Sequence, residues 1–335
     1  MAPSALAWPA VLDLLADGQW HSGSALGEAL AVSRAAIWKQ VRALRSLGLE
    51  VLAERRRGYR LDRPLDLLNP VRIRDELTPV TRAGMQLLEV LLVTPSTNAR
   101  LAAEPAPPPG QIRAVAAEYQ TGGRGRRGRR WLSPPGHGVC LSVAWSFESA
   151  PRDLPALSLV AGVAVIGALQ QLGVGGVQLK WPNDVMAAGG KGGGILVDVS
   201  GESGGPLRAV VGIGLNVRPV PGIATALLLE GGHLPAVALD DLLPGAGLDR
   251  SVLVGALINR LHECLVGFGD RGWPDVLPVW RQNDYLAGRS VVVTRGADTL
   301  SGIARGIADD GALLVEADGR IFPIVAGDVT LRAPL

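Results

Sequence analysis

A run of alternating glycine and arginine, Gly122–Arg130, limits the fold of this chain more than any other feature. Apolar runs at Ile112–Tyr119 and Val139–Trp145 flank it and predict two strands. Glycine lets a backbone approach a ligand closely, and arginine supplies forked donors that match carboxylate and phosphate oxygens. Because the run is too charged to fold on itself, we expect a loop that stays mobile until an anion orders it.

The same composition also occurs in segments that bind RNA or DNA. Those segments are usually long repeats in disordered tails, whereas this run is short and lies between two predicted strands. It also lacks the glycine and lysine spacing of a P-loop. The net charge of the chain is only +2, so any nucleic-acid surface must be local.

Residues 1–65 form a separate predicted unit with a helix at Ala10–Ala16, a second at Ser22–Leu30, a third from Ser33 to about Leu47, and a hairpin from Leu49 to Leu61. This order is typical of a winged helix-turn-helix, in which the second helix of the pair lies in the DNA major groove. The alternative is a protein-contact module with a solvated basic face. The residues predicted to contact DNA are Ser33, Arg34, Trp38, Lys39, Arg42, Arg56 and Arg57.

The rest of the chain divides into a linker at 66–86, a central domain at 87–285 and a C-terminal unit at 286–335. Few helices among many strands predict an α+β domain with a mixed sheet. From Arg289 onward, four short strands between Gly and Asp turns predict a small β-barrel. The central strands are expected at Leu87–Val93, Ile112–Tyr119, Val139–Trp145, Val177–Trp181, Ile195–Val199 and Val210–Val217, and the long helices at Leu154–Leu172 and Arg250–Gly267.

Cys140 and Cys264 lie far apart among apolar neighbours, which indicates buried free thiols in a reducing cytosol rather than a disulfide or a metal site. Polar residues and glycines interrupt the apolar run Leu154–Leu172, so we expect a buried helix and no membrane span. The N-terminus lacks a basic segment followed by an apolar run, and no signal peptide is predicted.

Two of the three lysines among the 33 basic residues, Lys180 and Lys191, lie in one segment. Asp184, on a turn that follows a strand, could hold Mg²⁺ or order the arginine loop. The compact charge of a lysine suits a carboxylate oxygen that becomes a mixed anhydride. The alternative is a plain turn with solvated lysines.

Two further motifs are ambiguous on their own. Ser96 or Thr97 could cap a helix, which is the usual role of such residues, or could bind a polar ligand ring together with Asn98. Small residues alternate with apolar ones at Val211–Val217, where a flat group could lie. Asn216 there could contact a nucleotide or make a hydrogen bond at the end of a strand.

Taken together, the motifs resemble bifunctional biotin–protein ligases that double as biotin-operon repressors. The match runs from Ser33–Ile37 to Gly311–Val315 and includes the arginine loop and both lysine motifs. The resemblance implies a winged helix, a catalytic domain of the biotin/lipoyl-ligase type and an SH3-like barrel. It also implies that the biotin carboxylate attacks the α-phosphate of Mg-ATP. A lysine of a biotin carboxyl carrier protein would then take biotin from the adenylate.

The resemblance also implies roles for individual residues. Lys191, Arg126 and Arg124 would be catalytic, and Asp184 would be a tentative Mg²⁺ ligand. The implied biotin contacts are Ser96, Thr97, Asn98, Gln120, Arg124, Gly125, Arg126 and Lys191. The implied nucleotide, phosphate or supporting contacts are Arg127, Arg129, Trp131, Lys180, Asn183, Asp184 and Asn216.

The other implied partners are operator DNA and a second copy of the adenylate-bound chain, in the cytoplasm and without a membrane. Val220–Leu248 departs from the family pattern because it has no aromatic residue, so no adenine-stacking residue is placed there. A lipoate ligase and a pure ligand-sensing transcription factor are the rival interpretations.

Overall fold

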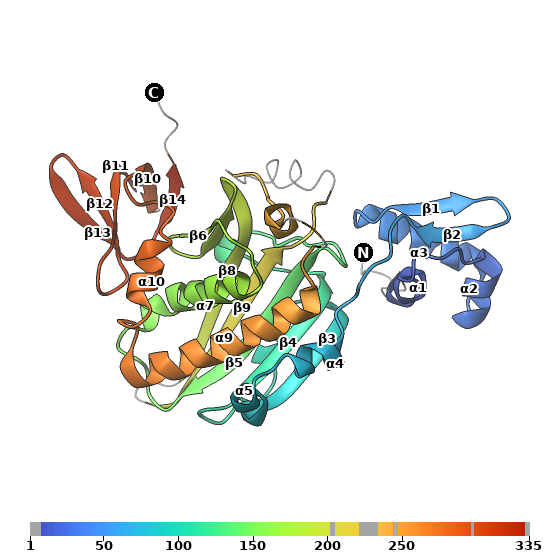
Figure 1. Ribbon diagram of the computed structural model, residues 1–335, viewed down its shortest axis with the longest axis horizontal. Coiled ribbons are helices and arrows are strands. Elements are labelled where there is room, and N and C mark those ends of the chain that lie inside the picture. The colour runs from blue at the N-terminus through green and yellow to red at the C-terminus, as the bar shows by residue number, and fades with distance from the viewer. Residues whose placement is uncertain are drawn as a thin grey trace.

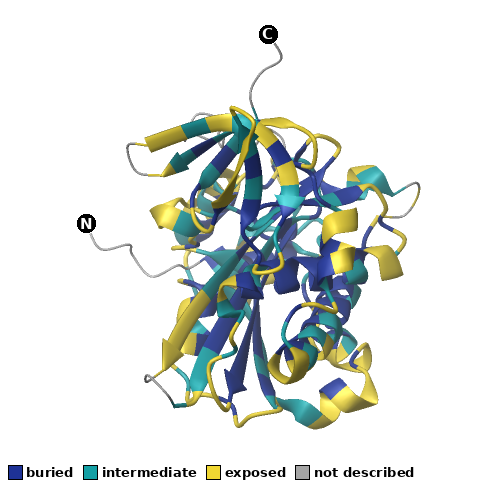
Figure 2. Cartoon of the chain, turned by 90° about the vertical axis from the view of Figure 1, so that its left-hand side faces the viewer, coloured by how far each residue is buried: buried dark blue, intermediate teal, exposed yellow. Residues whose placement is uncertain are grey.

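The structure, a computed structural model, describes residues 8–201, 205–220, 234–243, 245, 247–295 and 298–331. A small helical head, a central unit built on a large sheet and a C-terminal β-sheet follow one another along the molecule (Figure 1). Buried residues fill the interior between the central sheet and its helices (Figure 2).

The head consists of α1 (Trp8–Leu15), α2 (Gly23–Ala29), α3 (Arg34–Ser46), β1 (Val51–Glu54) and β2 (Gly58–Leu61). The hydroxyls of Ser22 and Ser33 accept hydrogen bonds from backbone N–H groups three residues later and begin α2 and α3. The predicted order of three helices followed by a hairpin is confirmed. One stripe of α3 is buried in the core of the head, and it consists of Ile37, Val41 and Leu44.

The segment 66–86, predicted to be a linker, packs against the central unit. It contains α4 (Pro70–Asp75) and α5 (Pro79–Gly84), both of which pack against α9 (Arg250–Arg271). The segment packs there because its apolar side chains reach the central core, where Leu68, Ile73 and Leu77 are buried.

The central sheet has seven strands in the order β3-β4-β5-β9-β8-β7-β6. Only β3 and β4 pair in parallel, so the sheet is mixed as predicted. Helices α7 (Leu157–Gln171) and α9 cover one face, and α6 (Thr97–Ala102) packs on the other. The strands are β3 (Met85–Thr94), β4 (Ile112–Gln120), β5 (Gly138–Phe147), β6 (Val177–Lys180), β7 (Asp184–Ala187), β8 (Gly190–Gly201) and β9 (Leu207–Asn216).

Strand β7 was not predicted, because Asn183-Asp184 suggests a turn and the strand that follows is only four residues long. It pairs with β6 on one side and β8 on the other. As a result, Asp184 faces the motif that carries Lys191.

Two helical segments, Leu154–Gln171 and Arg250–Arg271, are long and apolar enough to cross a membrane by composition alone. In the structure, 67% of the apolar stretch of the first segment and 56% of that of the second are buried. They are buried because α7 and α9 pack on each other and on the sheet. The prediction that the first is a buried core helix is confirmed.

The C-terminal sheet is antiparallel and runs in the order β13-β12-β11-β10-β14. The four predicted strands are confirmed, and a fifth, β14, was missed because it is short. The order is open in the described residues, so a closed barrel stays a prediction. The strands are β10 (Ser290–Arg295), β11 (Asp298–Ile307), β12 (Leu313–Ala317), β13 (Arg320–Ile324) and β14 (Asp328–Leu331). A short helix, α10 (Leu277–Gln282), precedes them.

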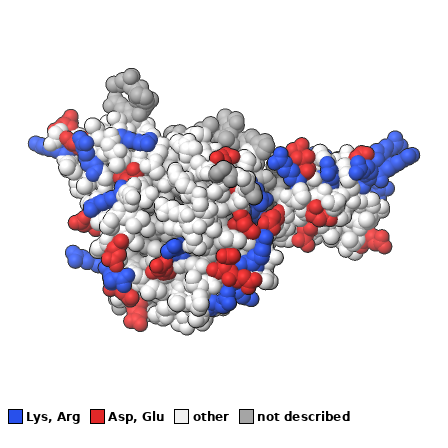
Figure 3. Space-filling view, in the orientation of Figure 1, with Lys and Arg blue, Asp and Glu red and all other residues white. Residues whose placement is uncertain are grey.

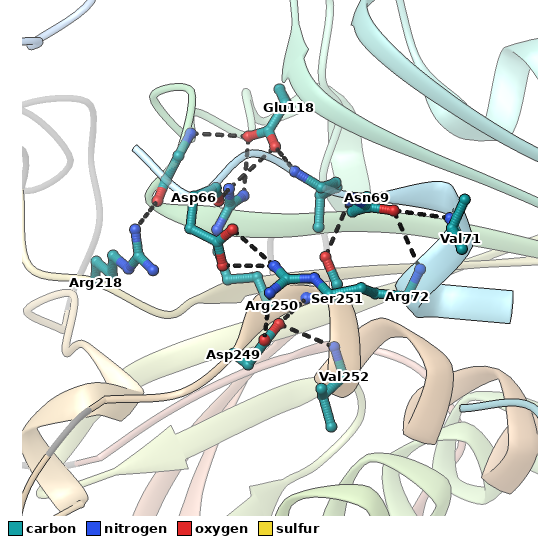
Figure 4. Close-up of polar contacts among 12 residues, drawn as sticks. Asp66, Asn69, Val71, Arg72, Glu118, Arg218, Asp249, Arg250, Ser251 and Val252 are labelled. Carbon is teal, nitrogen blue, oxygen red and sulfur yellow. Dashed lines mark hydrogen bonds and ion pairs between the residues drawn. The ribbon is translucent and has the colours of Figure 1, made fainter. Parts of the chain in front are cut away.

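A buried ion pair joins the start of the 66–86 segment to the central unit (Figure 4). Arg250 donates from Nη1 to Glu118 Oε2 at 2.9 Å and from Nη2 to Oε1 at 3.0 Å. Glu118 also accepts from the backbone N–H groups of Leu68 at 2.5 Å and Gly136 at 2.8 Å. Both charged side chains are only 1% exposed. Three stretches of chain are thereby fixed to the carboxylate of Glu118 in β4.

Candidate functional site

The Ser96–Asn98 motif starts α6 on the sheet face opposite α7 and α9. The Ser96 hydroxyl caps the helix by accepting from Ala99 N at 3.4 Å, so the capping interpretation is correct for this residue. Gln120 Oε1 accepts from the backbone N–H of Thr97 at 2.8 Å and from its hydroxyl at 3.1 Å. The end of β4 and the start of α6 are thus locked together.

Asn98, the last residue of this motif, is buried. Its Nδ2 donates to Asp198 Oδ2 at 2.9 Å, and its Oδ1 lies 2.6 Å from the Ser142 hydroxyl. A Cβ at Gly212 would lie 2.3 Å from the same Oδ1, so only glycine fits there. Ser142 and Asp198 were not predicted, since each falls within an ordinary strand pattern.

Trp131 forms a wall of the site. Its indole ring lies so close to β9 that a Cβ on Gly214 would be 2.4 Å from the ring. This contact explains the glycine at 214, as the contact with Asn98 explains the glycine at 212, in the pattern that suggested room for a flat group. Here the flat group is a side chain of the protein itself. Next to it, burial raises the pKa of the Cys140 thiol to about 12, as expected for an inert core cysteine.

The arginine loop is closed into a small hairpin. Gly125 N donates to Arg129 O at 2.7 Å, and Trp131 N donates to Gly123 O at 2.9 Å. The backbones of Arg124 and Arg130 form an antiparallel β-bridge at its base. The loop therefore has its own backbone order, in addition to any order that a ligand gives.

Three arginines of the loop point toward other parts of the chain. Arg126 is half-buried and donates to Asn183 Oδ1 at 3.4 Å, and burial lowers the pKa of its guanidinium. Arg127 and Arg129 bind Asp328 of the C-terminal sheet at 2.6 and 2.8 Å. Asp328 was not predicted, because it belongs to no motif in the sequence.

Both lysines of the central unit bind Asp184. Lys191 Nζ lies 2.5 Å from Asp184 Oδ1, and Lys180 Nζ lies 3.5 Å from Oδ2. Burial alone would raise the pKa of Asp184, but Lys191 and Lys180 outweigh it and the pKa is lowered. Burial also lowers the pKa of Lys180. The lysines are therefore partnered, which differs from the solvated alternative.

This arrangement bears on the tentative Mg²⁺ site at Asp184. Both carboxylate oxygens already face ammonium groups. Within the described parts of the chain, no group of three or more His, Cys, Asp or Glu side chains could hold a metal ion. These donors do not fit a resident Mg²⁺, so we treat the ion only as a companion of ATP.

The two asparagines predicted at the nucleotide site bond to the backbone. Asn216 Nδ2 donates to Lys191 O at 3.1 Å, and Asn183 Nδ2 donates to Ile195 O at 2.7 Å. Asn216 thus makes the bond at a strand end that was the alternative interpretation. The predicted adenine-covering region lies partly outside the described residues, at 221–233.

The sheet brings these motifs together through a continuous series of contacts. Gln120 holds Thr97, the loop that begins after it places Trp131 against β9, and Arg126 reaches Asn183. Asn216, at the end of β9, then holds the backbone of Lys191. These contacts connect the hydroxyl and amide groups of the Ser96–Asn98 motif, through the sheet, to the cations around Asp184.

A second candidate surface lies on the head. The predicted DNA contacts on α3, namely Ser33, Arg34, Trp38, Lys39 and Arg42, are all exposed, as are Arg56 and Arg57 between the strands of the hairpin. Trp38 is 49% exposed, and the Arg42 guanidinium lies 4.8 Å from the centre of its ring. Basic side chains gather at the far end of the head (Figure 3).

Three parts of the chain match known protein families. Residues 10–60 match an HTH domain, 90–216 the biotin/lipoate A/B protein ligase family and 287–332 the biotin protein ligase C-terminal domain. The chain is similar to the bifunctional ligase/repressor BirA of Salmonella typhimurium, at 38% identity over 96% of this chain and 97% of that protein. The corresponding protein of Bacillus subtilis is 30% identical over 94% and 95%.

The fold also matches a solved structure. The biotin protein ligase of Aquifex aeolicus in complex with biotin and ATP is 27% identical, with a TM-score of 0.58 over 74% of this chain and 98% of that one. The resemblance suggested by the motifs is confirmed. The chain belongs to the family of bifunctional biotin ligase/repressors.

Proposed function

We propose that the chain is an ATP-dependent biotin–protein ligase and a biotin-responsive DNA-binding repressor. The observation that carries the ligase function is that Arg126 of the arginine loop reaches Asn183, next to the Asp184 carboxylate that binds Lys180 and Lys191. The buried Thr97 and Asn98 are joined to the same sheet through Gln120 and Asp198. Two anions, a carboxylate and a triphosphate, repel each other unless cations neutralise both.

We infer the roles of the site residues from the family resemblance, and their positions in the structure support the inference. Hydroxyl and amide groups of Ser96, Thr97, Asn98 and Gln120 would bind the polar ring of biotin. Arg124, Gly125 and Arg126 would cover the junction between carboxylate and phosphate, and Lys191 would hold the carboxylate oxygen. Lys180, Arg127 and Arg129 would contact phosphate. Asn183, Asp184 and Asn216 would fix these cations and strands, and Trp131 would wall the adenylate from water.

The reaction has two steps. The biotin carboxylate attacks the α-phosphate of ATP and pyrophosphate leaves, which gives biotinyl-5′-AMP. An amine of a carboxyl carrier protein then attacks the acyl carbon and AMP leaves. The loop neutralises the reactants and shields the reactive anhydride from water, so it serves both steps.

The first test measures release of pyrophosphate from ATP by the full chain, with and without biotin. The second measures the mass of a carrier domain after incubation with the chain, biotin and ATP. Biotin-dependent release and a mass gain of one biotinyl group are expected. If only lipoate is transferred, the chain is a lipoate ligase. If no pyrophosphate is released, the chain is a ligand sensor without ligase activity.

The DNA-binding function depends on the exposed basic face of α3 and the hairpin turn. Phosphate contacts make such binding strongly salt-dependent. A chain without residues 1–65 should lose DNA binding and keep ligation. Equal DNA binding by the truncated chain would contradict this assignment.

The finer features of the proposal come from the family resemblance. They are a closed SH3-like barrel, dimerisation of the adenylate-bound chain, an acceptor lysine on a biotin carboxyl carrier protein, and a cytoplasmic location without membrane attachment. Sedimentation of the chain with and without biotin and ATP tests the dimer.

A further inference from the structure

The arginine loop binds a carboxylate of its own chain. Asp328 Oδ2 accepts from Arg127 Nη1 at 2.6 Å and from Arg129 Nη2 at 2.8 Å. One carboxylate oxygen is shared by two guanidinium groups, whose N–H donors also match phosphate oxygens. The partners lie about 200 residues apart, since the sequence separations are 201 and 199.

Asp328 is held in position by the docking of the C-terminal sheet. Trp181 Nε1 donates to Gly311 O at 3.1 Å, and Trp273 Nε1 donates to Asp309 O at 2.7 Å. The core of this sheet is continuous with that of the central unit. The carboxylate is therefore presented by a rigid support, although it remains 24% exposed.

The backbone of the loop does not depend on this carboxylate for its shape. The hairpin is closed by its own hydrogen bonds, from Gly125 N to Arg129 O and from Trp131 N to Gly123 O. What Asp328 adds is negative charge. That charge also acts on Arg126 and Lys180, whose pKa values it raises against the effect of burial.

The charges around the loop do not cancel, and the excess positive charge can bind a larger anion. The interacting cations are Lys180, Lys191, Arg126, Arg127 and Arg129, and the anions facing them are Asp184 and Asp328. These seven side chains therefore carry five positive and two negative charges, a sum of +3. Asp184 is buried and binds two lysines, whereas Asp328 binds two arginines that are exposed to solvent. Asp328 is therefore the anion that a ligand can replace.

We propose that Asp328 is an internal carboxylate that occupies the anion position between Arg127 and Arg129, and that the diphosphate of the nucleotide displaces it. The inference rests on the proposed ligase function for the identity of the anion. It makes Asp328 a positioning residue: the carboxylate neutralises the loop without ligand, and it competes with pyrophosphate for the same donors.

The experiment measures binding of inorganic pyrophosphate to the full chain by titration calorimetry. Asp328→Asn keeps the size of the side chain and one acceptor oxygen but removes the charge. It should bind pyrophosphate about fivefold more tightly than the native chain, the range expected for loss of a partly exposed competing ion pair. Asp309→Asn is the matched control, because Asp309 pairs with Arg281 at 2.8 Å in the same unit, away from the loop.

If Asp328→Asn binds pyrophosphate as the native chain does, or more weakly, the inference is overturned. Such a result would mean that the carboxylate has a structural role and does not compete with pyrophosphate. The double variant Arg127→Gln/Asp328→Asn should lose the gain. If Asp328→Asn does not fold, Asp328→Ser gives the same comparison. Biotin-dependent pyrophosphate release by the native chain tests the ligase function separately, so either proposal can fail alone.

Discussion

Lys191 Nζ lies 2.5 Å from Asp184 Oδ1, and the backbone of the same lysine is held by Asn216 at the end of β9. The ammonium therefore has a fixed position before any ligand arrives. A preorganised charge costs little reorganisation when a carboxylate becomes an acyl phosphate. This relationship makes Lys191 the first residue to change.

Lys191→Ala should lower biotin-dependent pyrophosphate release by about a hundredfold, the size expected when one donor to a developing charge is removed. The matched control is Lys39→Ala, which removes an exposed lysine of the head and should leave release unchanged. Steady-state release measures both. Similar rates for Lys191→Ala and the native chain would mean that this lysine only neutralises Asp184.

Arg250→Met should destabilise the chain by about 3–5 kcal/mol, because it leaves the buried Glu118 carboxylate without its cation. Glu118 would keep only its backbone donors from Leu68 and Gly136. Denaturant unfolding gives the free energy. The control is Arg260→Met, which breaks an exposed pair with Glu263 and should cost little. Equal losses for the two variants would contradict the role of the buried pair.

Asp284 should make stability depend on pH. Burial raises its pKa to about 6, so the folded state binds the proton more tightly than the unfolded chain does. The free energy of unfolding should therefore fall as pH rises from about 4, the usual value, to about 6. Asp284→Asn removes this loss, so its gain in melting temperature should be larger at pH 8 than at pH 5. The same gain at both pH values would show that Asp284 does not titrate there.

A DNA fragment that the full chain selects from a random pool serves as the ligand. Trp38→Ala should weaken binding to this fragment about tenfold, because the exposed ring and Arg42 present one apolar and one cationic contact to base edges. Lys39→Ala should instead reduce the salt dependence by about one unit of slope, as expected for a phosphate contact. Filter binding over a salt series separates the two. Native affinity in Trp38→Ala would place DNA elsewhere on the head.

Local patterns in the sequence predicted most of the fold. The stripe Ile37, Val41 and Leu44 placed α3 correctly, and the apolar runs located six of the central strands. The exceptions were short elements such as β7 and β14, whose four residues carry too little periodicity. The 66–86 segment was misjudged because its burial depends on α9, far along the chain.

The candidate site was predictable where function requires an unusual composition. Glycine and arginine in Gly122–Arg130, and the rarity of lysine, pointed to residues that the sheet brings together. The partners of these residues could not be found in the same way. Asp328, Ser142 and Asp198 are ordinary residues in ordinary strands, and only the tertiary structure places them against the motifs.

The engagement of Lys180 and Lys191 with Asp184 has a further consequence for an enzyme that makes an activated acyl group. An acyl adenylate reacts with any accessible unprotonated amine. Of the three lysines in the sequence, Lys180 and Lys191 both bind the Asp184 carboxylate, and the third, Lys39, is on the separate head. The chain thus offers its own product very few lysine amines, and the two beside the site are bound to a carboxylate.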